Sequence, residues 1–314
     1  MGCKKTSIGG QALIEGIMMR GPKRDVMAVR TKDGSIDVRE MSLKGIRNKN
    51  KLFKLPIIRG VVGFIDSMMI GYKAMMQSAD ISGYLDEEDE APKGDSKTVM
   101  GVIMVVATVI AVILSVGLFI YLPSLAFKGV NILLGGVLSP LQSLFEGILK
   151  ITIFLCYMIA VSYMKDIKRV FQYHGAEHKT IFCYEAGLEL TVENVRGQKR
   201  FHPRCGTSFM ILMLIVSIFV TFILDAIVPW LKGVLWLRTI IKLLLIPIIC
   251  GIGYELIKIC GKHDNAITRI IAAPGLFIQR ITVKEPDDAM IEVAIAAMSE
   301  VIEPEENNDC TAGA

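Results

Sequence analysis

The chain has 314 residues and a formal net charge of +4; 52% of its residues are hydrophobic and its mean hydropathy is +0.49. This composition is too apolar for an ordinary soluble domain and indicates a membrane protein, with the lipid bilayer as its expected partner. Lysine and arginine are dispersed among acidic residues and no nucleic-acid-binding motif occurs, so no nucleic acid is expected as a partner. The sequence identifies neither a protein partner nor a homo-oligomer interface, and leaves both open.

The first 85 residues predict a small cytoplasmic region of mixed α+β structure. Residues 26–41, VMAVRTKDGSIDVREM, alternate apolar and polar side chains around Asp33 and Gly34, which predicts a β-hairpin. Residues 56–81 are apolar but interrupted by charges. They predict a helix that either lies in the membrane interface or packs on the hairpin or the helical bundle. The acidic residues that follow predict a solvated linker over 86–98.

Four apolar stretches are long enough to cross a bilayer, which takes about 20 residues. They cover approximately residues 99–121, 145–164, 207–228 and 235–259. The fold expected is therefore an α-helical integral membrane protein with about four transmembrane helices and a small cytoplasmic α+β portion. Asp225 and Glu255 lie near span ends. If they lined one polar cavity they would indicate a transporter.

The distribution of basic residues predicts the orientation. The connection between the second and third spans carries Lys165, Lys168, Arg169, Lys179, Arg196, Lys199, Arg200 and Arg204. The two opposite loops offer little more than Lys128, Lys232 and Arg238. No signal-peptide pattern precedes the first span. The positive-inside rule then predicts a multi-pass protein of the bacterial inner membrane with both termini in the cytoplasm.

The last part of the chain is predicted to return to the cytoplasm. It breaks at Pro274 and Gly275 into an extended segment and forms a helix from about Asp287. The seven cysteines have irregular spacing, so no disulfide framework is expected in a reducing compartment. The expected division is 1–85 (cytoplasmic region), 86–98 (linker), 99–164 (first two spans), 165–206 (cytoplasmic loop), 207–259 (last two spans) and 260–314 (cytoplasmic segment).

The loop between the second and third spans contains a candidate metal site in YHGAEHKTIF, residues 173–182. On a helix, His174 and His178 lie one turn apart on the same face, where their imidazoles could bind one divalent ion. Glu177 lies beside them, where a carboxylate can act as general base toward a water on the metal. The spacing H-x-x-E-H is that of inverzincin proteases. The alternative is a polar helix end with solvated side chains.

The ligand set is expected to be completed by RFHPRCGTSF, residues 200–209. His202 and Cys205 are three residues apart, and Cys205 directly precedes a span, at a helix N-terminus that favours a thiolate. A His/Cys set suits zinc, with iron as the other candidate. Since Met164 and His174 are ten residues apart, the motif is predicted to lie about 15 Å beyond the membrane edge.

Four segments of the chain closely resemble the YqhQ-like family of bacterial membrane proteins, a domain family of unknown function. They are GGQALIEGIMMRGP, YHGAEHKTIFCYE, RFHPRCGTSF and APGLFIQRITVKEPDDAMIEVAIAAM. Members are described as predicted metal-dependent enzymes without an established substrate. The resemblance implies that His174, Glu177, His178, His202 and Cys205 form a functional metal site.

The leading hypothesis is a membrane-bound, zinc-dependent hydrolase. Its metal ligands would be His174, His178 and either His202 or Cys205, and Glu177 would be the catalytic base. Arg204, Arg200, Gln11 and Glu15 are candidate substrate-binding residues. The alternative is a non-enzymatic membrane scaffold or regulator. In it His174 and His178, together with His202 and Cys205, close a structural metal site with no open position. A transporter is the third hypothesis.

Overall fold

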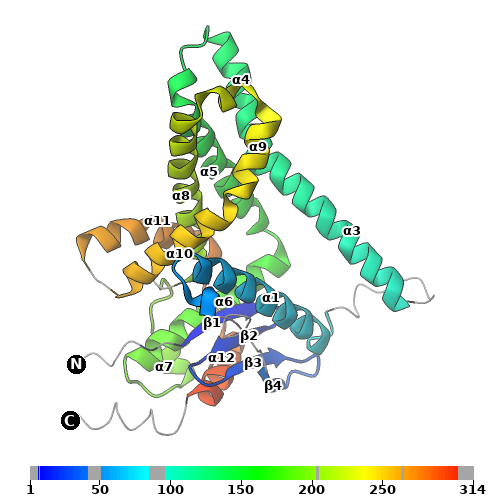
Figure 1. Ribbon diagram of the computed structural model, residues 1–314. Helices are drawn as coiled ribbons and strands as arrows, with labels where there is room; N and C mark the ends of the chain where they lie inside the picture. The colour runs from blue at the N-terminus through cyan, green and yellow to red at the C-terminus, as the bar shows by residue number, and fades with distance from the viewer. Residues whose placement is uncertain are drawn as a thin grey trace.

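The computed structural model describes residues 6, 8–41, 51–84, 96–202, 205–262 and 265–302. Within these residues a long helical bundle stands on a smaller domain that is built around a β-sheet (Figure 1). The predicted 86–98 linker lies mostly outside the described residues, as does Arg204.

The sheet has four antiparallel strands in sequential order. The strands are β1 (Gly9–Leu13), β2 (Gly16–Arg20), β3 (Asp25–Arg30) and β4 (Ile36–Met41). The predicted hairpin is confirmed, because β3 and β4 pair from Asp25 with Met41 to Arg30 with Ile36. Gly34 has φ +87° in the connecting turn, a conformation that a residue without a Cβ adopts at little cost.

Helices cover both faces of this sheet. On one face, Met18 and Met27 pack against Ile70 and Ala74 of α1 (Ile58–Ile81), which follows the short helix η2 (Lys51–Lys54). The other face packs against α6 (Lys165–Glu185), α7 (Val192–Arg196) and α12 (Asp288–Val301). Side chains of successive strand residues point to opposite faces, and this alternation supplies both apolar surfaces. The small domain therefore joins three parts of the chain that are far apart in sequence.

The bundle contains the apolar helices. These are α3 (Ser96–Val116), η3 (Gly117–Tyr121), α4 (Leu122–Leu133), η4 (Ser139–Leu141), α5 (Gln142–Val161), α8 (Gly206–Ile227), η5 (Pro229–Gly233), α9 (Leu235–Leu244) and α10 (Ile246–Lys262). Three segments are long and apolar enough to cross a membrane: Val105–Leu133, Ser139–Val161 and Gly206–Ile227. The bent pair α9–α10, with 44° between its halves, makes a fourth if it counts as one span.

The first of these segments is longer than predicted. The sequence suggested an end near Tyr121, but the helix continues through a π-helical turn and Pro123 to Leu133. Pro123 is the second residue of α4, directly after the π-helical turn, which is a position that tolerates a residue without an N–H.

The expected extended segment at Pro274 and Gly275 is wrong. These residues lie inside helix α11 (Ala266–Thr282), which begins with a capping box between Asn265 and Thr268. Gly275 permits close packing on α8, since a Cβ there would lie 2.4 Å from the Ser208 side chain. The cap and this close contact stabilise a helix that the proline alone would interrupt.

Arg238 is not a loop cation, as the sequence suggested, but lies inside the bundle with its side chain 1% exposed. Its guanidinium donates to Asp225 Oδ2 at 2.8 Å and also to Glu146. Lys242 Nζ lies 2.5 Å from the second Glu146 oxygen. An isolated charge in apolar surroundings is costly, so this network ties α5, α8 and α9 together.

Asp225 and Glu255 belong to separate ion pairs. Asp225 pairs with Arg238, whereas Glu255 on α10 forms a two-pronged ion pair with Arg59 of α1. These two carboxylates are thus held by different cations on different helices, and the transporter hypothesis stays a prediction.

We expect Arg238→Met to lower the free energy of unfolding by about 3–5 kcal/mol, because it leaves the buried Asp225 carboxylate without a cation and leaves Glu146 with Lys242 alone. Thermal unfolding of the full chain in detergent micelles measures the change. Arg39→Met is the matched control, since Arg39 pairs with Asp37 at the surface of β4 and should change stability little. Equal effects of the two substitutions would contradict the assigned role of the buried network.

Candidate metal centre

Helix α6 presents His174 and His178 on the same face. The residues are four apart, so they stack one above the other along the helix, and their ring centroids are 4.5 Å apart. The helical geometry assumed from the sequence is confirmed here. It does not continue from the preceding span, because the backbone leaves the helix at Met164 before α6 begins.

Each imidazole is held by a main-chain carbonyl from a distant part of the chain. His174 Nδ1 lies 3.0 Å from the carbonyl oxygen of Thr282, and His178 Nδ1 lies 2.6 Å from that of Arg200. A carbonyl only accepts hydrogen bonds, so both Nδ1 atoms carry the proton. In the neutral rings both Nε2 atoms then present a lone pair, as ligating histidines do.

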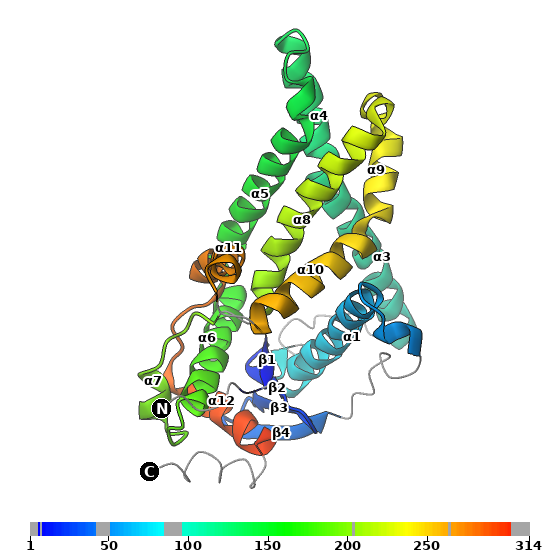
Figure 2. The same cartoon turned by 60° about the vertical axis from the view of Figure 1, so that its left-hand side comes forward.

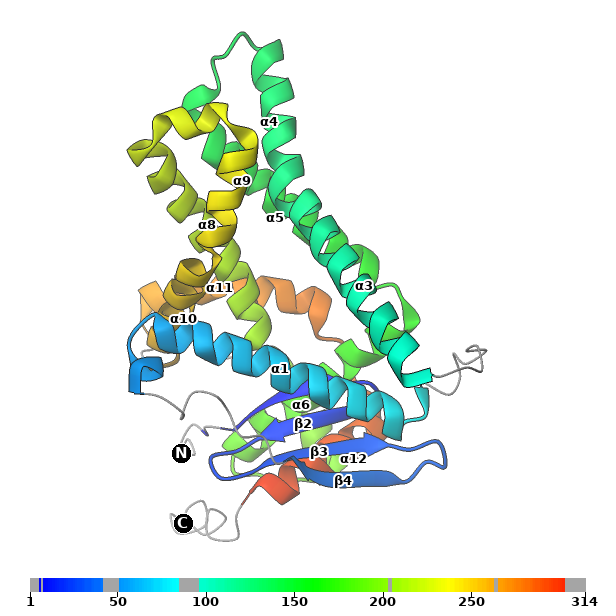
Figure 3. The ribbon, with the colours of Figure 1, turned by 45° about the vertical axis from the view of Figure 1, so that its right-hand side comes forward.

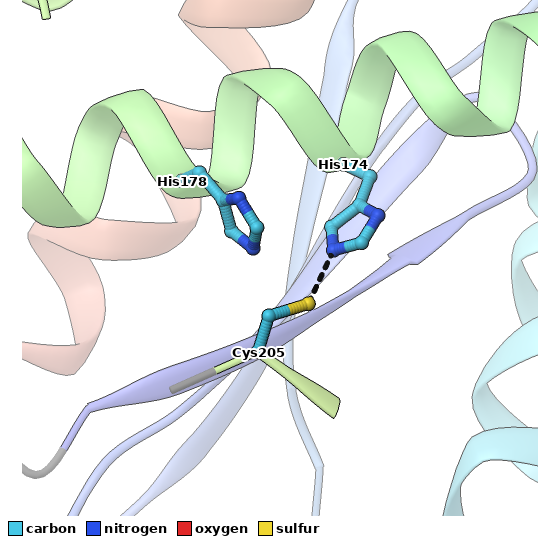
Figure 4. A group of neighbouring side chains, drawn as sticks. All are labelled: His174, His178 and Cys205. Atoms are coloured by element: carbon cyan, nitrogen blue, oxygen red, sulfur yellow. Dashed lines mark hydrogen bonds between the residues drawn. The ribbon is translucent and has the colours of Figure 1, made fainter. Parts of the chain in front are cut away.

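Cys205 brings a sulfur to the same point (Figure 4). Its Sγ lies 3.1 Å from His174 Nε2. Together with His178, these residues each offer a ligand atom, and the three atoms all lie within 4.8 Å of one another. Two imidazole nitrogens and a sulfur are a donor set that suits zinc, and three protein ligands leave one position open in a tetrahedral site.

Cys205 is positioned by the start of α8. It is the N-cap residue, and its Sγ accepts a hydrogen bond from the Thr207 N–H at 3.4 Å. The positive end of the helix dipole faces the sulfur, which favours an anionic ligand there. Because Cys205 directly precedes α8, the cluster lies at the N-terminal end of this apolar helix. The predicted separation of about 15 Å between the motif and the membrane edge stays a prediction.

Glu177 is buried beside the two histidines, with 5% of the residue exposed. One carboxylate oxygen, Oε2, has no hydrogen-bond partner. The carboxylate packs on Gly10 of β1, where a Cβ would lie 2.8 Å from it. Burial raises the pKa of Glu177 to about 7, against the opposing effects of His174 and of a hydrogen bond from the Gly10 backbone. A buried carboxylate with an orphaned oxygen calls for a ligand or a functional role.

His178 is held in the state that ligation requires. Burial lowers its pKa, while Cys205 and the Arg200 carbonyl act in the opposite direction. The residue is 1% exposed. A neutral ring with its Nδ1 proton on a carbonyl is ready to bind through Nε2 without first losing a proton.

His202 is near the cluster but outside the set of three. Its ring centroid is 5.6 Å from that of His178, and its Nε2 lies 3.8 Å from a Glu185 oxygen. Its main-chain N–H and carbonyl both bond the side-chain amide of Gln279, each at 2.8 Å. Of the four predicted ligands, His174, His178 and Cys205 therefore lie together. The fourth, His202, has its imidazole beside Glu185.

The sequence did not single out Gln279. It is fully buried in α11 and holds the main chain of His202, just before Cys205. The one hint was a lone amide in the apolar run GLFIQRIT. The role of the Thr282 carbonyl gives no sequence signal, since any residue could supply it.

The candidate substrate-binding residues are engaged elsewhere. Arg200 donates to Glu285 at 3.1 Å, while its carbonyl orients His178. Glu15 pairs with Arg169 and accepts from the Tyr173 hydroxyl at 3.2 Å. The Glu15 contacts fasten the β1–β2 turn to α6, and the Arg200 ion pair joins the segment after α7 to the segment between α11 and α12.

Gln11 lies on the other side of the sheet from the histidines. Its amide packs over Gly71 of α1, whereas the neighbouring Gly10 faces Glu177. Adjacent strand residues point to opposite faces, so only one of the two can reach the cluster. The contact that β1 makes with this site therefore comes from its backbone rather than from the predicted side chain.

Gly175 controls how closely α6 approaches the segment after α11. A Cβ at this position would lie 2.0 Å from the Lys284 carbonyl oxygen. The Lys284 N–H also donates to the Phe171 carbonyl at 2.9 Å. This close contact brings the nearby Thr282 carbonyl to His174.

We expect Gly175→Ala to lower the free energy of unfolding by about 1–3 kcal/mol, because backbone must move to admit the methyl group. Gly197→Ala is the control, since its nearest neighbours would be 3.6 and 3.8 Å away. Denaturant unfolding of both variants makes the comparison. Equal stabilities would show that this contact does not set the spacing.

Three to four apolar helices joined to a small antiparallel sheet define a helical, membrane-associated protein. Residues 55–304 match the family described as "Protein of unknown function (DUF1385)". The chain is also 37% identical over 301 residues to the uncharacterised protein YqhQ of Bacillus subtilis (strain 168), covering 94% of this chain and 92% of that protein. The chain therefore belongs to the DUF1385 family, and its resemblance to YqhQ-like proteins is confirmed. No solved structure matches it.

Proposed function

We propose that this chain is a multi-pass protein of the bacterial inner membrane whose sheet-containing domain, with both termini, faces the cytoplasm. The asymmetry of basic residues supports this orientation. Burial of Arg238 in ion pairs increases that asymmetry, because Arg238 no longer counts as a loop charge.

We further propose that the protein is a metal-dependent hydrolase, with zinc as the expected metal and iron as the alternative. The observation that carries this proposal is the pair of Nδ1–carbonyl hydrogen bonds, which leave two imidazole Nε2 atoms beside Cys205 Sγ. His174, His178 and Cys205 would hold the metal. When bound, it would polarise a substrate carbonyl or phosphoryl oxygen and make a water molecule more acidic.

Glu177 is the proposed general base. Its orphaned oxygen is free to accept a proton, and a pKa near 7 suits transfer in both directions at neutral pH. Arg200 would have to leave Glu285 before it could stabilise negative charge on a substrate. Burial of the cluster would limit competing water, since His178 and Cys205 are 1% and 7% exposed.

The competing hypothesis is a membrane scaffold or regulator with a structural metal site. In that case His202 would supply a fourth ligand and close the site. Its proximity to Glu185 favours the open, three-ligand arrangement.

The metal content of the detergent-purified protein tests the site. We expect near-stoichiometric zinc or iron in the wild type and its loss in the His174→Ala/His178→Ala double variant and in Cys205→Ser. Cys183→Ser is the matched control, because Cys183 is also buried on the domain side but bonds only main-chain oxygens. Absence of metal after reconstitution under reducing conditions would refute the proposal, as would equal metal loss in the two cysteine variants.

Glu177→Gln separates the enzyme from the scaffold. The substitution keeps size and shape, so we expect it to retain the metal and to abolish hydrolysis of ester, phosphoester or peptide probes that the wild type cleaves. His202→Gln should retain both metal and activity. If Glu177→Gln left activity unchanged, Glu177 would not be the base; if His202→Gln lost the metal, the closed structural site would be favoured.

A further inference from the structure

Helix α1 has an apolar stripe that nothing in the described part of the chain covers. Ile65, Met68, Met69 and Tyr72 follow the helical spacing i, i+3, i+4, i+7 and are 46–58% exposed. The opposite face is buried on the sheet and includes Ile70 and Ala74. A water-soluble surface helix would have polar residues at these positions.

The position of α1 relative to the spans identifies what lies against the stripe. Arg59 pairs with Glu255, and a Cβ at Gly60 would lie 2.8 Å from the Tyr254 side chain. Glu255 is five residues inside the end of the α10 apolar segment at Cys260, which corresponds to roughly 8 Å along the helix. The start of α1 is therefore at the depth of the apolar helices rather than below them.

Helix α1 slopes from the end of α10 down toward the sheet, so its N-terminal half lies closest to the bundle (Figure 2). Figure 3 shows α1 running across the base of the bundle, between the sheet and the α8–α10 pair, toward the lower end of α3. Phe64 of α1 also contacts Phe209 in the first turn of α8, with ring centroids 5.9 Å apart. The side of α1 away from the sheet thus faces the region that the spans occupy.

Helix α11 also has an exposed apolar stripe. In α11, Ile267, Ile270 and Phe277 are 56–72% exposed along one stripe. Gly275 of this helix packs on Ser208, the third residue of α8. Figure 2 shows α11 and α1 on either side of α8.

We infer that α1 and α11 are interfacial helices whose exposed stripes insert into the acyl chains just below the lipid headgroups. The amphipathic pattern of both helices and their contacts with α8 are those expected of in-plane membrane helices beside the spans. This inference rests on the proposed membrane insertion and is independent of the metal. It places Cys205 and Thr282 at the headgroup level, so substrates of the candidate site would be presented at the membrane surface.

Photocrosslinking of the full chain in vesicles of phosphatidylethanolamine and phosphatidylglycerol tests the inference. A benzophenone amino acid replaces Tyr72 on α1 or Phe277 on α11, both conservative exchanges of an exposed aromatic ring. The spanning control is Phe219 in the middle of α8, and the water-facing control is Val38 on β4. Mass spectrometry then counts lipid adducts.

We expect probes at Tyr72 and Phe277 to form lipid adducts at a yield close to that of Phe219 and well above that of Val38. Adducts to a second copy of the chain would show that the stripes form an oligomer interface and do not contact lipid, which would overturn the inference. Adducts at Phe219 alone would overturn it while leaving the membrane spans intact. If Phe219 also formed none, membrane insertion itself would fail.

Discussion

A polar group removed from water must find a partner inside the protein, and this requirement organises the structure at every level. In the bundle, Arg238 is placed where it satisfies both Asp225 and Glu146. At the base, Gln279 satisfies both main-chain groups of His202. Two buried side-chain atoms of the described residues lack a partner: Arg30 Nε and Glu177 Oε2. Glu177 is the informative one, because it lies beside the His/Cys cluster of His174, His178 and Cys205.

The candidate centre exists because three segments meet at the N-terminal end of α8. Helix α6 supplies two imidazoles, the residue before α8 supplies the sulfur, and the end of α11 supplies the carbonyl that orients His174. None of these elements could fix the geometry alone. The contact at Gly175 and the contact at Gly275 draw α6 and α11 into place, so the spacing of ligand atoms depends on two positions where no side chain is present. Two glycines that carry no ligand atom thereby control the precision of the site.

Much of the architecture was predictable because it follows from local patterns. The hairpin follows from alternation around Asp33 and Gly34, and the apolar segments follow from their length. The helix carrying His174 and His178 was also predicted. Errors arose where a local pattern met a stronger tertiary contact. Pro274 indicated a break, but the cap at Asn265 and packing on Ser208 keep α11 helical. Arg238 looked like a loop charge because its carboxylate partners lie on other helices.

The sequence by itself determined the apolar helices, the hairpin and the residue types able to bind a metal, since these depend on composition and on spacing within a single segment. The choice of Cys205 over His202 as the third member of the cluster came from the folded chain. So did the engagement of Glu15 and Arg200 in ion pairs. The reason is physical: ligand distance, proton position and burial are set by contacts between segments far apart in the chain, such as the bond of His174 to Thr282, which lies 108 residues away.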